Sequence, residues 1–268
     1  MFPGFDLFGR FISSYTLMAL FGIFAAGIFA MAQYKKKTGD YYPMLVTLLF
    51  SAIGVGAGGC LLYGITNIKY WGLFLKIDSF DMFIQVVSYI FGGSVFYGGL
   101  IGGMIVAAII VKRNKYPAAE ITDSAAPAIA LFHAFGRVGC FLGGCCYGME
   151  SDFGFIYHNS LIESANGVRR FPVQLVEAGF ELILFFVLWR LLKSGKAKGI
   201  LFSIYLAFYA VGRFILEFFR GDEYRGFIFG LSTSQFISIF VFVFAVGFIV
   251  LKKVLKPKES NTAPEITE

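Results

Sequence analysis

Long apolar runs recur along the whole chain and constrain its fold more than any other feature. Of the 268 residues, 57% are hydrophobic and 15% are charged, whereas a soluble domain carries about 25% charged residues. Runs of about 20 apolar residues are long enough to cross the hydrocarbon core of a bilayer as helices. In lipid, each segment must satisfy its own backbone polar groups. The sequence therefore predicts an all-α polytopic membrane protein.

Seven segments are apolar enough to be predicted as spans. They are residues 11–33, 44–64, 84–111, 122–143, 173–192, 199–219 and 233–251. With this count, most Lys and Arg residues follow the first, third, fifth and seventh spans. Because cytoplasmic loops are enriched in these residues, we predict an N-terminus outside the cell and a C-terminus inside. The lysines at 35–37 directly follow the first span, which favours a retained helix over a cleaved signal peptide.

The polar segments suggest how the chain is organised. We expect one membrane domain over residues 1–254 and a disordered cytoplasmic tail over residues 255–268, where Pro, Glu and Thr are common. Residues 65–83 mix charges with aromatic residues and are predicted to form an interfacial arm at headgroup level. Residues 147–171 are the largest polar stretch and are predicted to form a small extracytoplasmic head. The net charge of +6 fits the positive-inside pattern, so we expect no nucleic-acid partner.

The fourth span contains a charge that a bilayer disfavours. A guanidinium at mid-membrane costs about 3 kcal/mol on insertion scales, and Arg137 lies within this span. His133, Arg137 and Cys140 have the spacing of one helix face. The pair Gly143 and Gly144 is expected to end the helix. This face is therefore predicted to border a polar site or a charged partner rather than lipid.

The sixth span repeats the pattern, with Tyr209, Arg213, Glu217 and Arg220 at helical spacing on one predicted face. One interpretation is that Arg213 and Glu217 form an ion pair that only neutralises both charges. Two arginines beside one glutamate instead favour an anion site, because guanidinium forks match phosphate oxygens. A phospholipid headgroup is the commonest phosphate at that depth. We therefore predict a headgroup site.

The fifth span adds a carboxylate inside the membrane. Gln174, Glu177 and Glu181 follow Pro172 at helical spacing, and Pro172 suits the start of a helix. Glu177 lies about one turn inside the predicted span. An unpaired carboxylate there would be protonated or matched to an arginine. We favour a match to an arginine.

These motifs resemble the prolipoprotein diacylglyceryl transferase family. The likeness follows the chain in order through "SSYTLMALFG", "FYGGLIGG", "DSAAPAIALFHAFGRVGCF", "FPVQLVEA", "YAVGRFILEFFRGDE" and "LSTSQFIS". The resemblance implies seven spans with the N-terminus outside, a multi-pass protein of the bacterial plasma membrane and an active site towards the outer leaflet. We expect no cofactor and no metal ion.

The resemblance also implies a reaction and its partners. The family transfers the diacylglyceryl group of phosphatidylglycerol to the thiol of a lipobox cysteine in the signal peptide of a prolipoprotein, and glycerol phosphate leaves. This reaction needs a thiolate, and cations for the departing phosphate. Two alternatives stay open from the sequence. One is a transferase of the same fold with another acceptor, and the other is a non-catalytic lipid-binding or thiol-redox membrane protein.

The motifs and the resemblance together give two sets of site residues. The catalytic candidates are Arg137, Arg213, His133, Tyr97 and Glu217. The substrate-binding candidates are Tyr15, Gly98, Gly99, Gly139, Cys140, Gly148, Tyr209, Arg220 and Glu177.

One departure from the family pattern concerns the proton acceptor. The family usually has Phe-His-Gly-Gly with a histidine treated as essential, whereas this chain has Phe-Tyr-Gly-Gly at 96–99. A tyrosine hydroxyl holds its proton at neutral pH, so Tyr97 would need strong help from neighbouring cations to act as a base. We hypothesise that His133 takes this role, with Tyr97 as the alternative.

A second departure concerns the cysteines. Cys140, Gly143 and Cys145 stand where the family usually has two asparagines and a glutamate. The favoured interpretation is that the cysteines are small packing residues. The alternatives are a disulfide that uses Cys145 or Cys146, a metal site formed by His133 with the three cysteines, and a covalent or relay role for Cys140.

Overall fold

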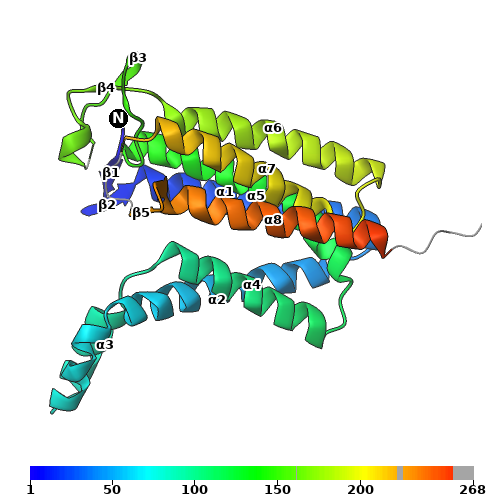
Figure 1. Cartoon of the computed structure of the whole chain (residues 1–268). Helices are drawn as coiled ribbons and strands as arrows, with labels where there is room; N and C mark the ends of the chain where they lie inside the picture. Colours follow the sequence, from blue (N-terminus) through cyan, green and yellow to red (C-terminus); the bar gives the residue numbers. More distant parts are fainter. Residues whose placement is uncertain (161, 222–225, 256–268) are drawn as a thin grey trace, which may run out of the picture. The chain divides into compact units, whose positions relative to one another are not determined.

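The computed structural model describes residues 1–160, 162–221 and 226–255 (Figure 1). Its α-helices are α1 (Ser14–Thr38), α2 (Tyr42–Thr66), α3 (Phe80–Phe91), α4 (Phe96–Arg113), α5 (Ala118–Gly143), α6 (Val173–Ser194), α7 (Leu201–Leu216) and α8 (Thr233–Val254). Short 3-10 segments are η1 (Ile68–Lys76), η2 (Glu163–Ala165) and η3 (Glu217–Phe219). Residues 256–268, most of the predicted tail, lie outside the described residues.

Three antiparallel strand pairs complete the described chain. They are β1 (Gly4–Leu7) with β2 (Arg10–Ser13), β3 (Glu150–Ile156) with β4 (Arg169–Arg170), and β5 (Phe227–Ile228) with β6 (Leu231–Ser232). The β1–β2 hairpin precedes α1, so the first helix begins at Ser14 and not at residue 11 as predicted. The β3–β4 pair lies within the predicted head.

The helices confirm the predicted fold class of an all-α polytopic membrane protein. Among the described residues, six helices are long and apolar enough to cross a membrane: α1, α2, α4, α5, α7 with η3, and α8. Helix α6 has 22 residues but contains Glu177, Glu181, Arg190 and Lys193. The predicted seventh crossing therefore depends on α6, and the predicted orientation stays a prediction.

The continuous span predicted over residues 84–111 is wrong. The chain there forms α3, a non-helical stretch at residues 92–95, and then α4. A Cβ on Gly93 would lie 2.5 Å from the ring of Tyr63 on α2. The glycine thus allows the chain to pass close to α2 where the helix is interrupted.

The described residues form two compact units: the first comprises Met1–Ala26 and the described residues from Thr122 onward, and the second is Gly27–Ile121. In the second unit, α2 packs on α4 through glycines. A Cβ on Gly58 would lie 2.3 Å from the Gly98 carbonyl oxygen, and one on Gly102 would lie 2.3 Å from that of Gly54. These glycines therefore allow α2 and α4 to pack closely.

In the first unit, α5, α6, α7 and α8 run side by side with the beginning of α1 (Figure 1). Buried Asp123 on α5 accepts hydrogen bonds from the Gly199 N–H at 2.5 Å and the Leu201 N–H at 3.1 Å. The Lys252 ammonium of α8 donates to the Gly199 carbonyl at 2.9 Å. The connection before α7 is therefore tied to α5 and α8.

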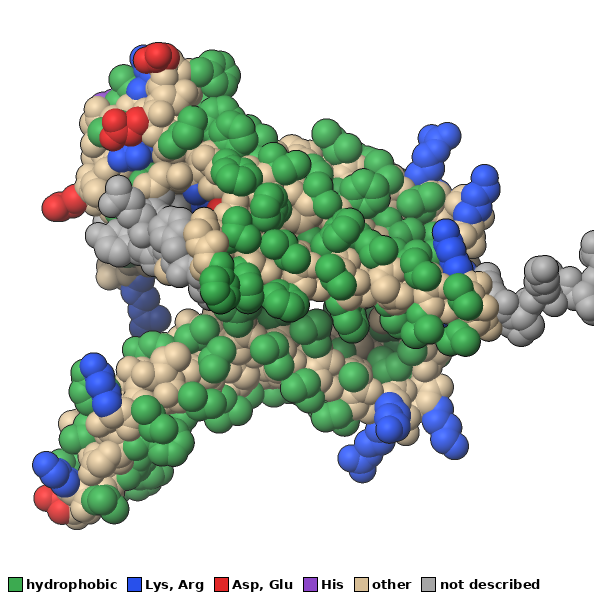
Figure 2. All heavy atoms as spheres, in the orientation of Figure 1, with side chains coloured by type: hydrophobic (Ala, Val, Ile, Leu, Met, Phe, Trp, Pro, Cys, Tyr) green, Lys and Arg blue, Asp and Glu red, His purple; other side chains and the backbone are tan. Residues whose placement is uncertain are grey.

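Charge is distributed unevenly along this bundle. Figure 2 shows hydrophobic side chains over its sides and Lys and Arg side chains near the ends of α6 and α8. The last turn of α6 carries Lys193, and that of α8 carries Lys252 and Lys253. The opposite ends of these two helices are where the predicted site residues gather.

Candidate active site

The charges predicted within the membrane lie near one set of helix ends in the first unit. These are the C-terminal ends of α5 and α7 and the N-terminal ends of α6 and α8. At 1.5 Å per residue, Arg137 is about 9 Å from the end of α5, Arg213 about 5 Å from the end of α7, and Glu177 about 6 Å from the start of α6. The three side chains therefore sit at comparable depths.

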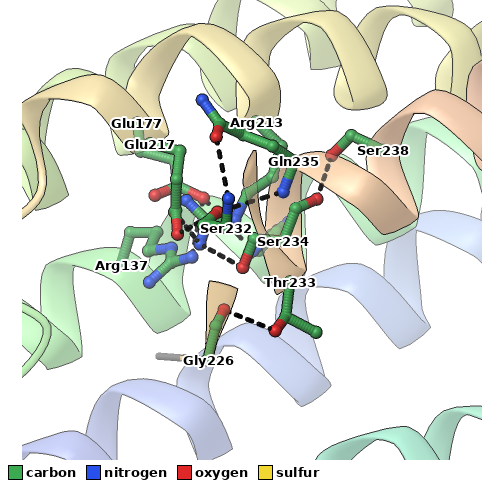
Figure 3. Close-up of polar contacts among 11 residues, drawn as sticks. Arg137, Glu177, Arg213, Glu217, Gly226, Ser232, Thr233, Ser234, Gln235 and Ser238 are labelled. Carbon is green, nitrogen blue, oxygen red and sulfur yellow. Dashed lines mark hydrogen bonds and ion pairs between the residues drawn. The ribbon is translucent and has the colours of Figure 1, made fainter. Parts of the chain in front are cut away.

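Arg137 pairs with a buried glutamate (Figure 3). Its Nη2 lies 2.7 Å from Oε1 of Glu177, and Glu177 is 1% exposed. The Glu177 carboxylate also interacts electrostatically with Arg213. The match of Glu177 to an arginine is confirmed. Removing one partner of such a pair leaves a buried charge without compensation.

Arg213 is held by a second set of contacts (Figure 3). Its Nη2 lies 2.5 Å from Oε2 of Glu217 and donates to the Ser234 hydroxyl at 3.0 Å. The Ser232 hydroxyl donates to Oε1 of Glu217 at 2.8 Å. Among the described residues, nothing accepts a hydrogen bond from the buried Nη1 of Arg213. One side of the guanidinium is anchored, and on the other side Nη1 has no acceptor within the part of the chain that the structure describes.

The start of α8 supports this arrangement. The Ser232 hydroxyl accepts from the Gln235 N–H at 3.2 Å, while the Gln235 side-chain oxygen accepts from the Ser232 N–H at 3.1 Å. This reciprocal capping box fixes the first turn of α8. Because Ser232 also binds Glu217, the N-terminus of α8, which favours negative charge, is held beside the Arg213 pair.

His133 lies deeper on α5 and faces the glutamates of α6. Its Nδ1 lies 3.2 Å from Oε1 of Glu181, and its Nε2 lies 3.9 Å from Oε1 of Glu177. Its ring packs against Tyr209 with 5.2 Å between the ring centroids. A carboxylate at one ring nitrogen is the arrangement that orients an acid–base histidine. The imidazole is four residues, or about 6 Å, deeper than Arg137.

The single helical face predicted for the sixth span is wrong in its last part. Helix α7 ends at Leu216, and Glu217 begins η3. Arg220 has an extended backbone, with φ −85° and ψ 143°. The helical spacing therefore does not place Arg220 on the face of Tyr209 and Arg213.

Arg220 joins the site through the head instead. It forms an isolated antiparallel bridge with Gly148. A Cβ on Gly148 would lie 2.3 Å from the Phe171 carbonyl oxygen, so this position needs glycine. Arg220 interacts electrostatically with both Arg137 and Arg213. Three guanidinium groups thus share one electrostatic neighbourhood.

Tyr15 and Gly139 lie where α1 meets α5. A Cβ on Gly139 would lie 3.2 Å from the Cα of Tyr15 and 3.1 Å from the Cβ of Met18. The half-exposed Tyr15 also interacts electrostatically with Arg137. The structure thus brings both substrate-binding candidates to the arginine cluster.

Three cysteines gather beside the arginines. The sulfur atoms of Cys140, Cys145 and Cys146 all lie within 4.8 Å of one another. All four cysteines of the chain are free thiols, so the structure does not support the disulfide interpretation. Hydrogen bonds with the Cys140 and Cys145 thiols, and the nearby Arg220, lower the pKa of the Cys146 thiol against the opposing effect of burial.

The predicted metal site of four ligands needs correction. His133 contacts the glutamates of α6 and is not part of the cysteine cluster. It precedes Cys140 by seven residues, or about 10 Å along α5. The cysteines alone remain as a group of possible ligands. Helix α5 ends at Gly143, as predicted.

Three candidates belong to the second unit and are described there. Tyr97 is partly exposed in the first turn of α4. Gly98 is buried against α2, and a Cβ on Gly99 would lie 3.1 Å from the Val55 carbonyl oxygen. The two glycines therefore serve helix packing, and the catalytic and binding roles of all three residues stay predictions.

The family model described as prolipoprotein diacylglyceryl transferase matches residues 4–251. The chain belongs to the prolipoprotein diacylglyceryl transferase family. The phosphatidylglycerol–prolipoprotein diacylglyceryl transferase of Clostridium tetani is 37% identical over 245 residues, which cover 90% of this chain and 94% of the relative. The Clostridium perfringens relative named phosphatidylglycerol–prolipoprotein diacylglyceryl transferase 2 is 34% identical over 260 residues, which cover 96% and 97%. The Rickettsia bellii transferase is 31% identical over 252 residues, which cover 88% of each chain.

The site of this member of the prolipoprotein diacylglyceryl transferase family includes residues that sequence reasoning missed. Ser232, Ser234 and Gln235 anchor Arg213 and Glu217 at the start of α8. The spacing Ser-x-x-Gln at the start of an apolar run is a capping-box signal, and it could have identified Ser232 and Gln235. Nothing in the sequence indicates that the Ser234 hydroxyl reaches the guanidinium.

Proposed function

We propose that this chain transfers the diacylglyceryl group of phosphatidylglycerol to the thiol of a lipobox cysteine in the signal peptides of prolipoproteins. The observation that carries the proposal is the pair Arg137 and Arg213, which lie on two helices and share the field of Glu177. The family membership and the names of the relatives support it.

The charge balance of the reaction explains why arginines are needed. The acceptor sulfur forms a bond to the terminal glycerol carbon of the diacylglyceryl group as the bond from that carbon to the phosphate oxygen breaks. A phosphodiester with one negative charge becomes a phosphomonoester that gains a second. Fixed guanidinium groups stabilise the charge that develops, and they do so best in a site shielded from water. Arg213 Nη1 offers a donor for this oxygen.

His133 is the proton acceptor in this proposal. Its Nδ1 faces Glu181, which is fully buried, so the carboxylate can orient the ring. Tyr97 remains the alternative base. The proton must come from the acceptor thiol, because the thiolate and not the thiol is the nucleophile.

The proposal places the protein in the bacterial plasma membrane with its active site towards the outer leaflet. The last turns of α1, α4, α6 and α8 all carry Lys or Arg. Such ends favour the cytoplasm. The arginine site lies at the opposite ends of α6 and α8, which suits phosphatidylglycerol from the outer leaflet.

A transfer assay tests the proposal. The purified protein is incubated in vesicles with acyl-labelled phosphatidylglycerol and a lipobox peptide, and label on the peptide is measured. A peptide with Ser in place of Cys is the control, and it should remain unlabelled. We expect Arg137→Gln and Arg213→Gln each to reduce the rate about 100-fold or more. Arg169→Gln, which removes an exposed guanidinium of the head that donates to the Gly154 carbonyl, should leave it nearly unchanged.

Two results would overturn the proposal. Label on an added acceptor other than the lipobox thiol would favour a transferase with a different substrate. Retained binding of phosphatidylglycerol without any transfer would favour a non-catalytic lipid-binding protein.

A further inference from the structure

The three clustered thiols have no part in the reaction as proposed so far. Cys140 lies in the last turn of α5, which ends at Gly143, and Cys145 and Cys146 follow the helix. Their sulfur atoms lie within 4.8 Å of one another, and they are free. Electrostatic contacts connect Arg137 with Cys140 and Cys146, and Arg220 with Cys146. The cluster thus lies beside the guanidinium groups of the candidate site.

The end of α5 explains how residues five apart come together. The Cys145 N–H donates to the Cys140 carbonyl at 3.1 Å, and the Gly144 N–H donates to the Phe141 carbonyl at 3.2 Å. Gly144 has a positive φ of 74°. These bonds form a Schellman motif, which turns the chain back over the last helical turn. The turn places Cys145 above Cys140.

Neighbouring elements hold this turn in place. The Gln174 side chain of α6 donates to the Cys145 carbonyl at 2.8 Å, and the Ser160 hydroxyl donates to the Gly144 carbonyl at 3.1 Å. Cys146 has a φ of 55°, a conformation that costs an L-residue about 1–2 kcal/mol. This backbone conformation at Cys146 accompanies the approach of its thiol to those of Cys140 and Cys145.

We propose that Cys140, Cys145 and Cys146 bind a zinc ion as three thiolates and leave its fourth position open. Zinc bound to sulfur at about 2.3 Å in tetrahedral geometry requires sulfur atoms about 3.8 Å apart. Side-chain rotation within a cluster of 4.8 Å provides this spacing. Three thiolates on Zn²⁺ leave one net negative charge, which Arg137 and Arg220 can balance. The proposal departs from the expectation of no metal, which came from the sequence.

The open fourth position of the zinc ion suits the thiol of the lipobox cysteine. This part of the inference rests on the proposed function. A thiol that binds zinc loses its proton to water and is held as a thiolate at neutral pH. Its sulfur then bonds to the glycerol carbon, glycerol phosphate leaves with the electrons of the broken C–O bond, and the three cysteines keep the zinc. No electron is gained or lost. The site would supply what the family histidine, replaced here by Tyr97, no longer provides.

Metal analysis of the full-length protein in detergent tests the site. After removal of any affinity tag, we expect about one zinc per chain, and thiolate-to-cobalt charge-transfer absorption after exchange with Co²⁺. Cys145→Ser and Cys146→Gly should each lower zinc affinity at least 10-fold. Glycine suits the positive φ at 146, so this variant removes the thiol without straining the turn. Cys60→Ser, in the other unit, is the matched control and should bind zinc as the wild type does.

The outcomes separate this inference from the proposed function. Equal zinc content in the wild type and in folded Cys145→Ser and Cys146→Gly proteins would overturn the site, as would a zinc-free protein that transfers lipid at the full rate. Zinc binding that depends on these cysteines, in a protein that transfers no lipid, would support the site and contradict the proposed function. Loss of zinc together with a fall in the transfer rate would support both.

Discussion

At the scale of single residues, the site is made of buried charges with fixed partners. Arg137 and Arg213 each pair with one glutamate, at 2.7 and 2.5 Å. His133 lies between two carboxylates of α6 but nearer to Glu181. Because ion pairs in lipid are costly unless their geometry is favourable, such contacts constrain where each side chain can point.

The role of His133 gives the first prediction. Replacing it with glutamine keeps a polar side chain beside Glu181 but removes the base, so we expect the transfer rate at saturating substrate to fall about 100-fold or more. The melting temperature should change little. His158→Gln is the matched control, because His158 is exposed in the head and is the other histidine of the chain. A near-normal rate for His133→Gln together with an inactive Tyr97→Phe would assign the base to Tyr97.

The charged residues could be predicted from the sequence because a bilayer leaves few places for them. Arg137, Glu177 and Arg213 each required a partner. Helical spacing predicts Glu217 as the partner of Arg213, and the depth of Glu177 in the membrane predicts that it pairs with an arginine. Ser234 could not be predicted in this way, because a serine carries no such penalty in a helix end. The sulfur cluster was missed as well, because it depends on the turn after α5 and not on helical periodicity.

At the scale of elements, glycine decides how closely helices approach and where they stop. The apolar pattern identified α1, α2, α5, α6, α7 and α8, but it joined α3 and α4 into one span. Only Gly92, Gly93 and Ser94 interrupt the apolar run there, and glycine is common inside membrane helices, so the apolar pattern does not distinguish a break from a continuous span. In the structure, the ring of Tyr63 lies where a Cβ at residue 93 would be, so glycine lets the chain pass close to α2 at the break.

The contact between α2 and α4 gives the second prediction. Gly58→Ala places a methyl group where only 2.3 Å separates it from the Gly98 carbonyl oxygen, so the helices must move apart. We expect a loss of about 1–3 kcal/mol in the free energy of unfolding, from the range for overpacked cores. Gly56→Ala, on the same helix with open space around it, should be neutral or slightly stabilising. Thermal unfolding in detergent measures both; equal stability of the two variants would contradict the packing role.

The start of α7 gives the third prediction. The Asp123 carboxylate accepts two backbone hydrogen bonds, from Gly199 and Leu201, inside the bundle. Asp123→Asn removes the charge and one acceptor oxygen, and we expect it to destabilise the protein by about 1–3 kcal/mol. Asp152→Asn, on exposed β3, should unfold at the wild-type temperature. If both variants melted together, the connection before α7 would not depend on this carboxylate.

At the scale of the whole molecule, basic residues in the last turn of a helix indicate which of its ends faces the cytoplasm. The basic last turns of α1, α4, α6 and α8 fit one orientation only if α6 also crosses the membrane. By composition α6 is the exception among the long helices, because of its four charged residues. The structure gives a reason to include α6 among the membrane-crossing helices, because its buried Glu177 and Glu181 pair with Arg137 and His133 of α5.

The crossing of α6 gives the last prediction. A helix of 22 residues is about 33 Å long and matches a hydrocarbon core of about 30 Å. Asp152 precedes α6 and Lys196 follows it, so a crossing puts them on opposite sides. In intact cells, we expect a membrane-impermeant maleimide to label Asp152→Cys above the wild-type background, and to label Lys196→Cys only after the membrane is permeabilised. Labelling of both from outside would mean that α6 does not cross, and the basic residues after it would then contradict the orientation inferred from the other helices.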